Sequence, residues 1–452
     1  MLDTPHREAE SIGALLARVR TARGMSQLRL AELLCAASGV PTITRHEVSR
    51  WEREERIPSA YWLSWLAVAL DVPADELEAA AAVARIRRAD VAPPPDSPLW
   101  TPRDAADLLT ALDRPASGDL LRLAHAWLAG GLDQRGALDR TGEQRRPADL
   151  DALAARLAEL RRMDDLVGGV DLVTLVDREL RVAVARLAGG SARDARRRMR
   201  LVAEFAQLAG WVAGDAGRPA AARRAYRVGL WAASAAGDRT LAAHLLGSLS
   251  HLVAGSGQPR EALLLAQTGY TGARRTAPAA AQALLLHRVA HAAALAGERR
   301  TSEHALAAAE RAADRRDPAR DPTWLYWLDG GELTAMAGRT FAALRRPLRA
   351  EPLLRANPCI APRTAALNGS WLARAYLDAG ESAQACVVAG DALLAAVRAN
   401  SVRAATRALA PAPQLLGLRG LAEAQDYAEL VAAARPYLPP AATARKAVTG
   451  AR

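Results

Sequence analysis

Two histidines with the spacing of a helical metal pair are the first candidates for chemistry. His287 and His291 are four residues apart, which places both imidazoles on one face of a helix. No acidic or cysteine partner is evident near them in the sequence, so we expect no metal site. The only lysine, Lys446, lies near the C-terminus, so neither a phosphate-loop lysine nor a Schiff-base lysine is available. No GxSxG, HExxH or dinucleotide-binding glycine pattern occurs. We therefore expect no enzymatic activity and no cofactor.

The cysteines and the net charge limit the possible compartment and partners of the protein. Cys35, Cys359 and Cys386 are far apart and form no CxxC pair, which argues against a disulfide framework and fits a reducing cytosol. The net charge of +11 suits a polyanionic partner, although arginine is abundant throughout the sequence. The first ten residues do not resemble a signal peptide, and no apolar run reaches about 18 residues. We expect a cytoplasmic protein without a membrane partner.

The composition predicts an all-α fold. Half of the 452 residues are apolar, many of them alanine, and aromatic residues make up only 4%. This length suggests two or three domains. A proline-rich run, APPPDSP, marks a linker, and a Pro- and Ala-rich tail is expected to be disordered. The predicted organisation is a small helical domain, a linker, a helical connecting region, a repeat domain and a tail, at residues 1–90, 91–102, 103–190, 191–435 and 436–452.

Five helices are expected in the N-terminal domain. The first stops at Gly24, and Ser26 can cap a second that starts at Gln27. Thr44 and Glu47 form a capping-box pattern that opens a third helix. A fourth helix starts at Pro58 and Ser59, and a fifth covers residues 75–88. The apolar residues expected to form the core of this domain are Ile12, Leu16, Val19, Leu30, Ala31, Leu34, Val48, Trp51, Leu63, Leu66 and Leu70.

The third predicted helix carries side chains that can read DNA bases. Arginine can bond guanine O6 and N7 with two hydrogen bonds, and histidine and serine can donate or accept. Arg45, His46 and Ser49 supply these groups on the outer face of the helix. The run Gly24-Met25-Ser26-Gln27 with Leu30-Ala31, followed by Val48-Ser49-Arg50-Trp51-Glu52, resembles the lambda-repressor-like, xenobiotic-response-element (XRE) helix-turn-helix family.

The resemblance implies specific contacts to double-stranded DNA. The third helix would lie in the major groove, and the start of the second helix would meet a phosphate. Arg50 and Arg53 would contact the DNA backbone. The segment Cys35–Thr42 makes the chain about seven residues longer than the family pattern, so a long turn is expected between the second and third helices. The DNA-binding residues implied are Ser26, Gln27, Thr44, Arg45, His46, Ser49, Arg50 and Arg53.

A repeat of about 40 residues follows in the C-terminal half. Turn glycines are predicted at Gly217, Gly257, Gly297, Gly338 and Gly380, with small residues at fixed offsets from each. The pattern resembles tetratricopeptide repeats between about Ala203 and Arg398, although most of their aromatic positions are absent. An α-solenoid of another type remains an alternative.

One repeat position gathers polar and aromatic residues that could bind an effector. Six residues before the predicted turns lie Trp211, His251, His291, Glu332 and Arg374, and His287, Gln207 and His244 fall at other groove positions. Such a groove could bind a peptide or a small polar ligand, or these residues could simply solvate an inner face. The sequence therefore predicts a homodimeric, DNA-binding transcription regulator that senses an effector. A DNA-tethered scaffold that recruits a protein partner is the alternative, and an enzyme with an unfamiliar site is a third, less favoured one.

Overall fold

The computed structural model divides the chain into two compact units, residues 1–97 and 98–452. The division falls inside the segment 91–102, most of which lies outside the described residues. Cys359 and Lys446 also lie outside the described residues. The structure describes residues 11–38, 43–89, 102–113, 120–128, 150–187, 194–356, 361–418 and 420–439.

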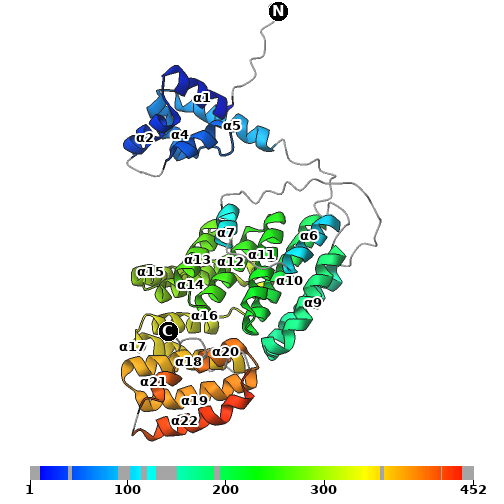
Figure 1. The fold of residues 1–452 in the computed structure, drawn as a ribbon, viewed down its shortest axis with the longest axis vertical. Helices are drawn as coiled ribbons and strands as arrows, with labels where there is room; N and C mark the ends of the chain where they lie inside the picture. Colours follow the sequence, from blue (N-terminus) through cyan, green and yellow to red (C-terminus); the bar gives the residue numbers. More distant parts are fainter. Residues whose placement is uncertain are drawn as a thin grey trace, which may run out of the picture. The chain divides into compact units, whose positions relative to one another are not determined.

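The described residues of the first unit form five helices, which are coloured blue in Figure 1. They are α1 (Ile12–Ala22), α2 (Gln27–Ser38), α3 (Arg45–Glu52), α4 (Ala60–Leu70) and α5 (Ala74–Ala89). Gly24 adopts a left-handed backbone conformation (φ 64°) in the turn after α1, a conformation that costs glycine little. The five predicted helices are therefore confirmed.

The core of the first unit matches the predicted apolar positions. Val48, Trp51, Leu66 and Leu70 are at most 2% exposed, and Val19 packs against the same core as a partly buried residue. Val48 and Trp51 hold the inner side of α3 against this core, and residues on the opposite side of the helix are exposed. Burial of these residues fixes which side of α3 is available for contact with a partner.

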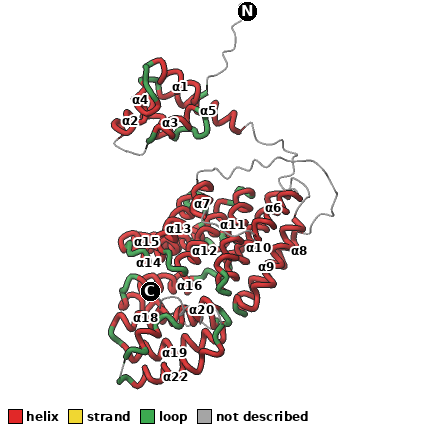
Figure 2. Tube along the Cα trace, viewed as in Figure 1, coloured by secondary structure: helices red, strands yellow, loops and turns green. Residues whose placement is uncertain are grey.

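The second unit is built from paired helices (Figure 2). Its helices are α6 (Pro102–Asp113), α7 (Leu120–Leu128), α8 (Leu150–Leu166), α9 (Gly169–Leu187), α10 (Ala195–Asp215), α11 (Pro219–Ala235), α12 (Arg239–Gly255), α13 (Pro259–Ala273), α14 (Ala279–Leu295), α15 (Arg299–Ala313), α16 (Gly330–Ala343), α17 (Pro347–Arg355), α18 (Pro362–Ala379), α19 (Ser382–Ala399), α20 (Val402–Ala408), α21 (Ala412–Leu415) and α22 (Ala422–Ala434), with 3₁₀ turns η2 (Pro318–Arg320), η3 (Thr323–Leu325) and η4 (Arg435–Tyr437). No strand occurs in the described parts of the chain, and the all-α prediction is confirmed.

Left-handed turns join successive helices of the repeat region. Gly217, Gly257, Gly297 and Gly380 have φ between 73° and 85°, in agreement with the 40-residue period. Gly237 makes a further turn of this kind, between α11 and α12. Because a left-handed turn strains most other residues, these glycines set where each helix stops.

The predicted turn at Gly338 is wrong. Gly338 lies inside α16, and the turn after α16 is at Arg345 (φ 54°), seven residues later. The 3₁₀ turns η2 and η3 lie between α15 and α16 and lengthen this repeat. Gly338 is small for another reason, since a Cβ there would lie 2.8 Å from Leu354 Cγ on α17. The residue six positions before the real turn is therefore Arg339.

The C-terminal helices form a second core. Helix α19 is long and apolar enough to cross a membrane by length and composition alone, but it packs against α18, α20 and α22. Leu438 is buried in the same core, so packed structure continues beyond residue 436, the predicted start of the tail. The rest of that tail, residues 440–452, lies outside the described part of the chain.

Candidate nucleic-acid interface and ligand cavity

The outer face of α3 carries most of the predicted DNA-binding side chains. Thr44, Arg45 and His46 are exposed at the start of the helix, and Ser49 is half-buried one turn later. In the part of the chain that the structure describes, Arg45 and His46 form no hydrogen bond or ion pair with another side chain. Their donors are free to meet a partner.

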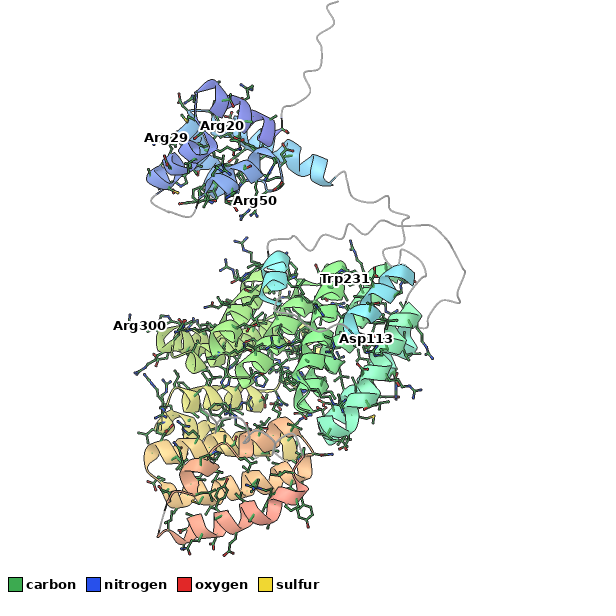
Figure 3. The ribbon with its side chains drawn as sticks, in the orientation of Figure 1. Arg20, Arg29, Arg50, Asp113, Trp231 and Arg300 are labelled. Atoms are coloured by element: carbon green, nitrogen blue, oxygen red, sulfur yellow. The ribbon has the colours of Figure 1, made fainter. Side chains whose placement is uncertain are left out.

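The predicted backbone-contacting arginines are engaged in surface ion pairs. Arg50 Nη1 lies 3.1 Å from Glu47 Oε1, and Arg53 Nε lies 3.1 Å from Glu55 Oε1. Arg50 points away from the helices of the first unit (Figure 3). Exposed pairs of this kind contribute about 1 kcal/mol or less, so a phosphate can replace the carboxylate partner.

The predicted capping box of α3 does not form. Thr44 has the extended backbone of a cap residue, but its side chain accepts no hydrogen bond from the helix. Glu47 bonds Arg50 and Arg56 instead of reaching back to Thr44. The ion pairs of Glu47 therefore replace the predicted reciprocal bonds.

The start of α2 is capped as predicted, with one difference at Gln27. The Arg29 amide donates to Ser26 Oγ at 3.1 Å. Gln27 Nε2 donates to Glu52 Oε2 at 2.7 Å, and the guanidinium of Arg20 also binds the Glu52 carboxylate. Gln27 is therefore part of a link between α1, α2 and α3, a role that its position in the sequence does not reveal.

The second unit contains a partly open cavity of about 740 Å³. Residues from α8, α10, α11, α12, α14, α16, α18 and α20 line it, together with the segment around η3. Its volume falls in the range of about 300–1,000 Å³ that is usual for small-molecule sites. All but one of the eight groove residues predicted from the sequence line the cavity: Gln207, Trp211, His244, His251, His287, His291 and Glu332.

A row of aromatic rings crosses the cavity. The rings of Trp211 and His251 stack with centroids 5.8 Å apart, and those of His251 and His291 are 6.5 Å apart. The ring of Trp371 meets His291 edge to face at 5.5 Å. We call these four residues the aromatic row. Arginines of α20 lie over both of its ends, Arg403 4.3 Å from the Trp211 centroid and Arg407 4.0 Å from the Trp371 centroid.

The imidazoles around the cavity are neutral. Burial, with the positive charge of nearby arginines, lowers the pKa of His244, His287 and His291 to about 3. The same causes lower the pKa of His251, whose Nε2 lies 3.2 Å from Arg403 Nη1 and can accept from it. At neutral pH these rings therefore act as flat polar surfaces and add no charge.

A buried carboxylate closes the helical array around the cavity. Asp215, at the end of α10, is 1% exposed and accepts from the Gly169 amide at 3.0 Å and from Ser401 Oγ at 2.9 Å. Arg403 Nε donates to it at 2.9 Å, and Arg363 lies 3.5 Å away. Burial alone would raise the pKa of Asp215, but the two arginines and the hydrogen bonds hold it below its usual value. These contacts, the Asp215 network, join α9 and α10 to α18 and α20.

One predicted effector residue lies elsewhere. Arg374 does not line the cavity, and its Nε donates to Asp378 on the same helix at 3.1 Å. Glu332 does line it, but from the first turn of α16 and not from the repeat position on which the prediction was based. Arg339 occupies that position, and it binds Glu332 at 2.5 Å and Asn368 Oδ1 at 2.7 Å.

Several cavity residues were not predicted from the sequence. They are Arg288, Arg339, Trp371, Arg403 and Arg407. Trp371 lies nine residues before its turn, as does Arg288, and this second inner position of the repeat was the signal available. The arginines of α20 lie outside the repeats, and nothing in their spacing indicates the cavity.

A metal site finds no support among the described residues, where no group of three histidine, cysteine or acidic side chains could hold an ion.

No protein-family model matches the sequence, and no curated protein matches it either. Among solved structures, the chain is similar to PlcR of Bacillus thuringiensis in complex with the peptide PapR7 and DNA. The sequence identity is 10%, the TM-score is 0.31, and the match covers 77% of this chain and 95% of PlcR.

Proposed function

We propose that this protein is a sequence-specific DNA-binding transcription regulator whose second unit binds an effector. The observation that carries the first part is the outer face of α3, where Arg45 and His46 are exposed at the start of a helix held from behind by Trp51. A helix so anchored, with free donors at its N-terminal end, suits the major groove. The proposed compartment is the cytoplasm.

Base reading is tested with Arg45→Ala. Sequences bound by the protein are first selected from random DNA, and affinity is then measured on a selected site and on unrelated DNA. Loss of a bidentate contact should weaken the selected site by about 1–3 kcal/mol and unrelated DNA much less. Arg53→Ala is the matched control, because an arginine that meets only phosphate should weaken both DNAs alike. Equal losses with Arg45→Ala would contradict base reading.

Gln27 makes a poorer control for phosphate contact than the sequence indicates. Because its side chain donates to Glu52, Gln27→Ala removes part of the link between α2 and α3 as well as any contact with DNA. Ser26 has the same difficulty, since its hydroxyl caps α2. Exposed arginines without structural partners in the core give the cleaner comparison.

The protein is proposed to act as a homodimer. A single unit of this size presents one short helix to DNA, and two half-sites about one helical turn apart would double the contacts. Footprints on selected DNA should show two protected half-sites related by dyad symmetry. A single asymmetric half-site, bound by a monomer in light scattering, would contradict this part of the proposal.

The effector role rests on the cavity. A row of four aromatic side chains bordered by arginines is a surface suited to a ligand, either a peptide or a small molecule. Mass spectrometry of protein purified from its host distinguishes this role from that of a scaffold. A copurifying small molecule or peptide supports the effector role, whereas a stoichiometric protein partner supports the scaffold.

A further inference from the structure

The charge that lines the cavity is unevenly matched. Six arginines and four carboxylates of the described residues face it. Four of the arginines have carboxylate partners: Arg161 with Glu204, Arg339 with Glu332, Arg363 with Asp164 and Arg403 with Asp215. The fourth lining carboxylate, Asp165, accepts from Tyr326 Oη at 2.9 Å. Within the described chain, Arg288 and Arg407 have no hydrogen-bond or ion-pair partner.

The two unmatched arginines come from different helices, and the charges of both act on His291. Arg288 extends from α14, one residue after His287, and Arg407 stacks on Trp371 from α20. Burial and the positive charge of Arg339 lower the pKa of Arg288 to about 10. Burial, Arg374 and Arg339 lower the pKa of Arg407 to about 10 as well. Both guanidinium groups are therefore still charged at neutral pH, in surroundings that disfavour an unmatched charge.

The neighbouring surfaces select a flat molecule. Arg407 lies over the Trp371 ring, His291 lies next to Trp371, and His251 and Trp211 continue the row. The imidazoles are neutral, so they attract no anion themselves and offer stacking faces and single hydrogen bonds. A ligand that satisfies the site needs an unsaturated body for the rings and oxygen acceptors for the guanidinium groups.

We propose that the cavity binds a small organic oxyanion, a carboxylate or a phosphate attached to a flat unsaturated body, with Arg288 and Arg407 as its anion-binding residues. The proposal rests on the effector role of the cavity and names the chemistry of its ligand. The unmatched positive charge excludes a flat cation, and a flat neutral molecule offers the two guanidinium groups no opposite charge.

Binding of matched probes to the full-length protein tests the proposal without DNA. The probes are 2-naphthoate, 2-naphthyl phosphate and the neutral 2-naphthamide, followed by quenching of tryptophan fluorescence or by calorimetry. Charge-assisted hydrogen bonds should make at least one anion bind about tenfold to a hundredfold more tightly than the amide. The tighter of the two anions identifies the oxyanion group. Equal or tighter binding of the amide, or no binding of either anion at millimolar concentration, would overturn the proposal.

Variants place the anion. Arg288→Gln and Arg407→Gln replace the charged guanidinium group with a shorter, neutral amide and should each reduce anion affinity about tenfold, with amide affinity unchanged. Arg300→Gln is the matched control, since Arg300 is exposed on the outside of α15 (Figure 3). Unchanged anion affinity in both cavity variants, with circular dichroism confirming their folds, would overturn the assignment. Failure of the probes would leave DNA reading by α3 intact, because that role is measured separately on selected DNA.

Discussion

Removing the carboxylate of Asp215 should loosen the closed form of the second unit. Asp215 is 1% exposed and holds four groups at once: the Gly169 amide, Ser401 Oγ, Arg403 and Arg363. In Asp215→Ala, two guanidinium groups and an amide lose an acceptor that water cannot easily replace. Breaking a buried ion pair in this way costs about 3–5 kcal/mol. We expect the free energy of unfolding to fall by about that amount.

Urea unfolding of the full-length protein, followed by circular dichroism, measures the loss. Asp177→Ala is the matched control, because Asp177 is also an aspartate paired with an arginine, but its side chain is half-exposed on α9. That variant should lose less than about 1 kcal/mol. Asp215→Asn keeps an acceptor without the charge and should fall between the two, and it serves if Asp215→Ala does not fold. If both Asp215 variants unfold within about 1 kcal/mol of the unchanged protein, the network does not hold the helices together.

Three further outcomes follow from the contacts described. Glu52→Ala should destabilise the first unit by about 3 kcal/mol, because Arg20 and Gln27 both lose a partly buried carboxylate partner. Hydrogen exchange of the α3 amides should become faster, and unchanged exchange would contradict this prediction. Lowering the pH from 7.5 to 5.5 should reduce the free energy of unfolding of the second unit by about 4 kcal/mol. In the folded protein His244, His287 and His291, with pKa values of about 3, stay neutral, whereas in the unfolded chain they take up protons below about pH 6.5, so stability is full above that pH and is lost as the pH falls. A melting temperature that does not change with pH would refute this. Gly272→Ala should destabilise the second unit by about 1–3 kcal/mol, because the added Cβ would overlap the Trp127 ring on α7. A melting temperature equal to that of the unchanged protein would count against this packing.

The parts of the fold that could be predicted from the sequence are those determined by residues close together in the chain. The helices of the first unit follow from apolar spacing, a serine cap at Ser26 and the turn at Gly24. The repeat turns follow from glycines that tolerate a left-handed backbone. The turn predicted at Gly338 is wrong because the sequence does not distinguish a glycine required for close helix packing from one required for a left-handed turn. The actual turn is at Arg345.

The cavity could be predicted only in part. Trp211, His251 and His291 share a repeat position, so the period of the sequence is enough to group them. The pair of Asp164 with Arg363 spans 199 residues, and that of Asp215 with Arg403 spans 188. Pairings at such separation depend on how far the helical array curves back on itself, which local patterns do not determine. Arg374 was misassigned for a related reason, because an acidic residue one turn further on its own helix engages it.

A ligand in the cavity would stabilise the same closed arrangement that the Asp215 network holds. A molecule lying on the aromatic row and bonded to Arg407 would contact α10, α12, α14, α18 and α20 together, and so it would bind only when these helices surround it. By linkage, it must raise the melting temperature of the second unit, and loss of the network must weaken its binding. We therefore expect 2-naphthoate or 2-naphthyl phosphate to bind Asp215→Asn less tightly than the unchanged protein, although Asp215 carries the same sign of charge as these ligands. Tighter binding to Asp215→Asn would mean that direct repulsion outweighs closure, and the cavity would then be a rigid site with no mechanical link to the rest of the unit.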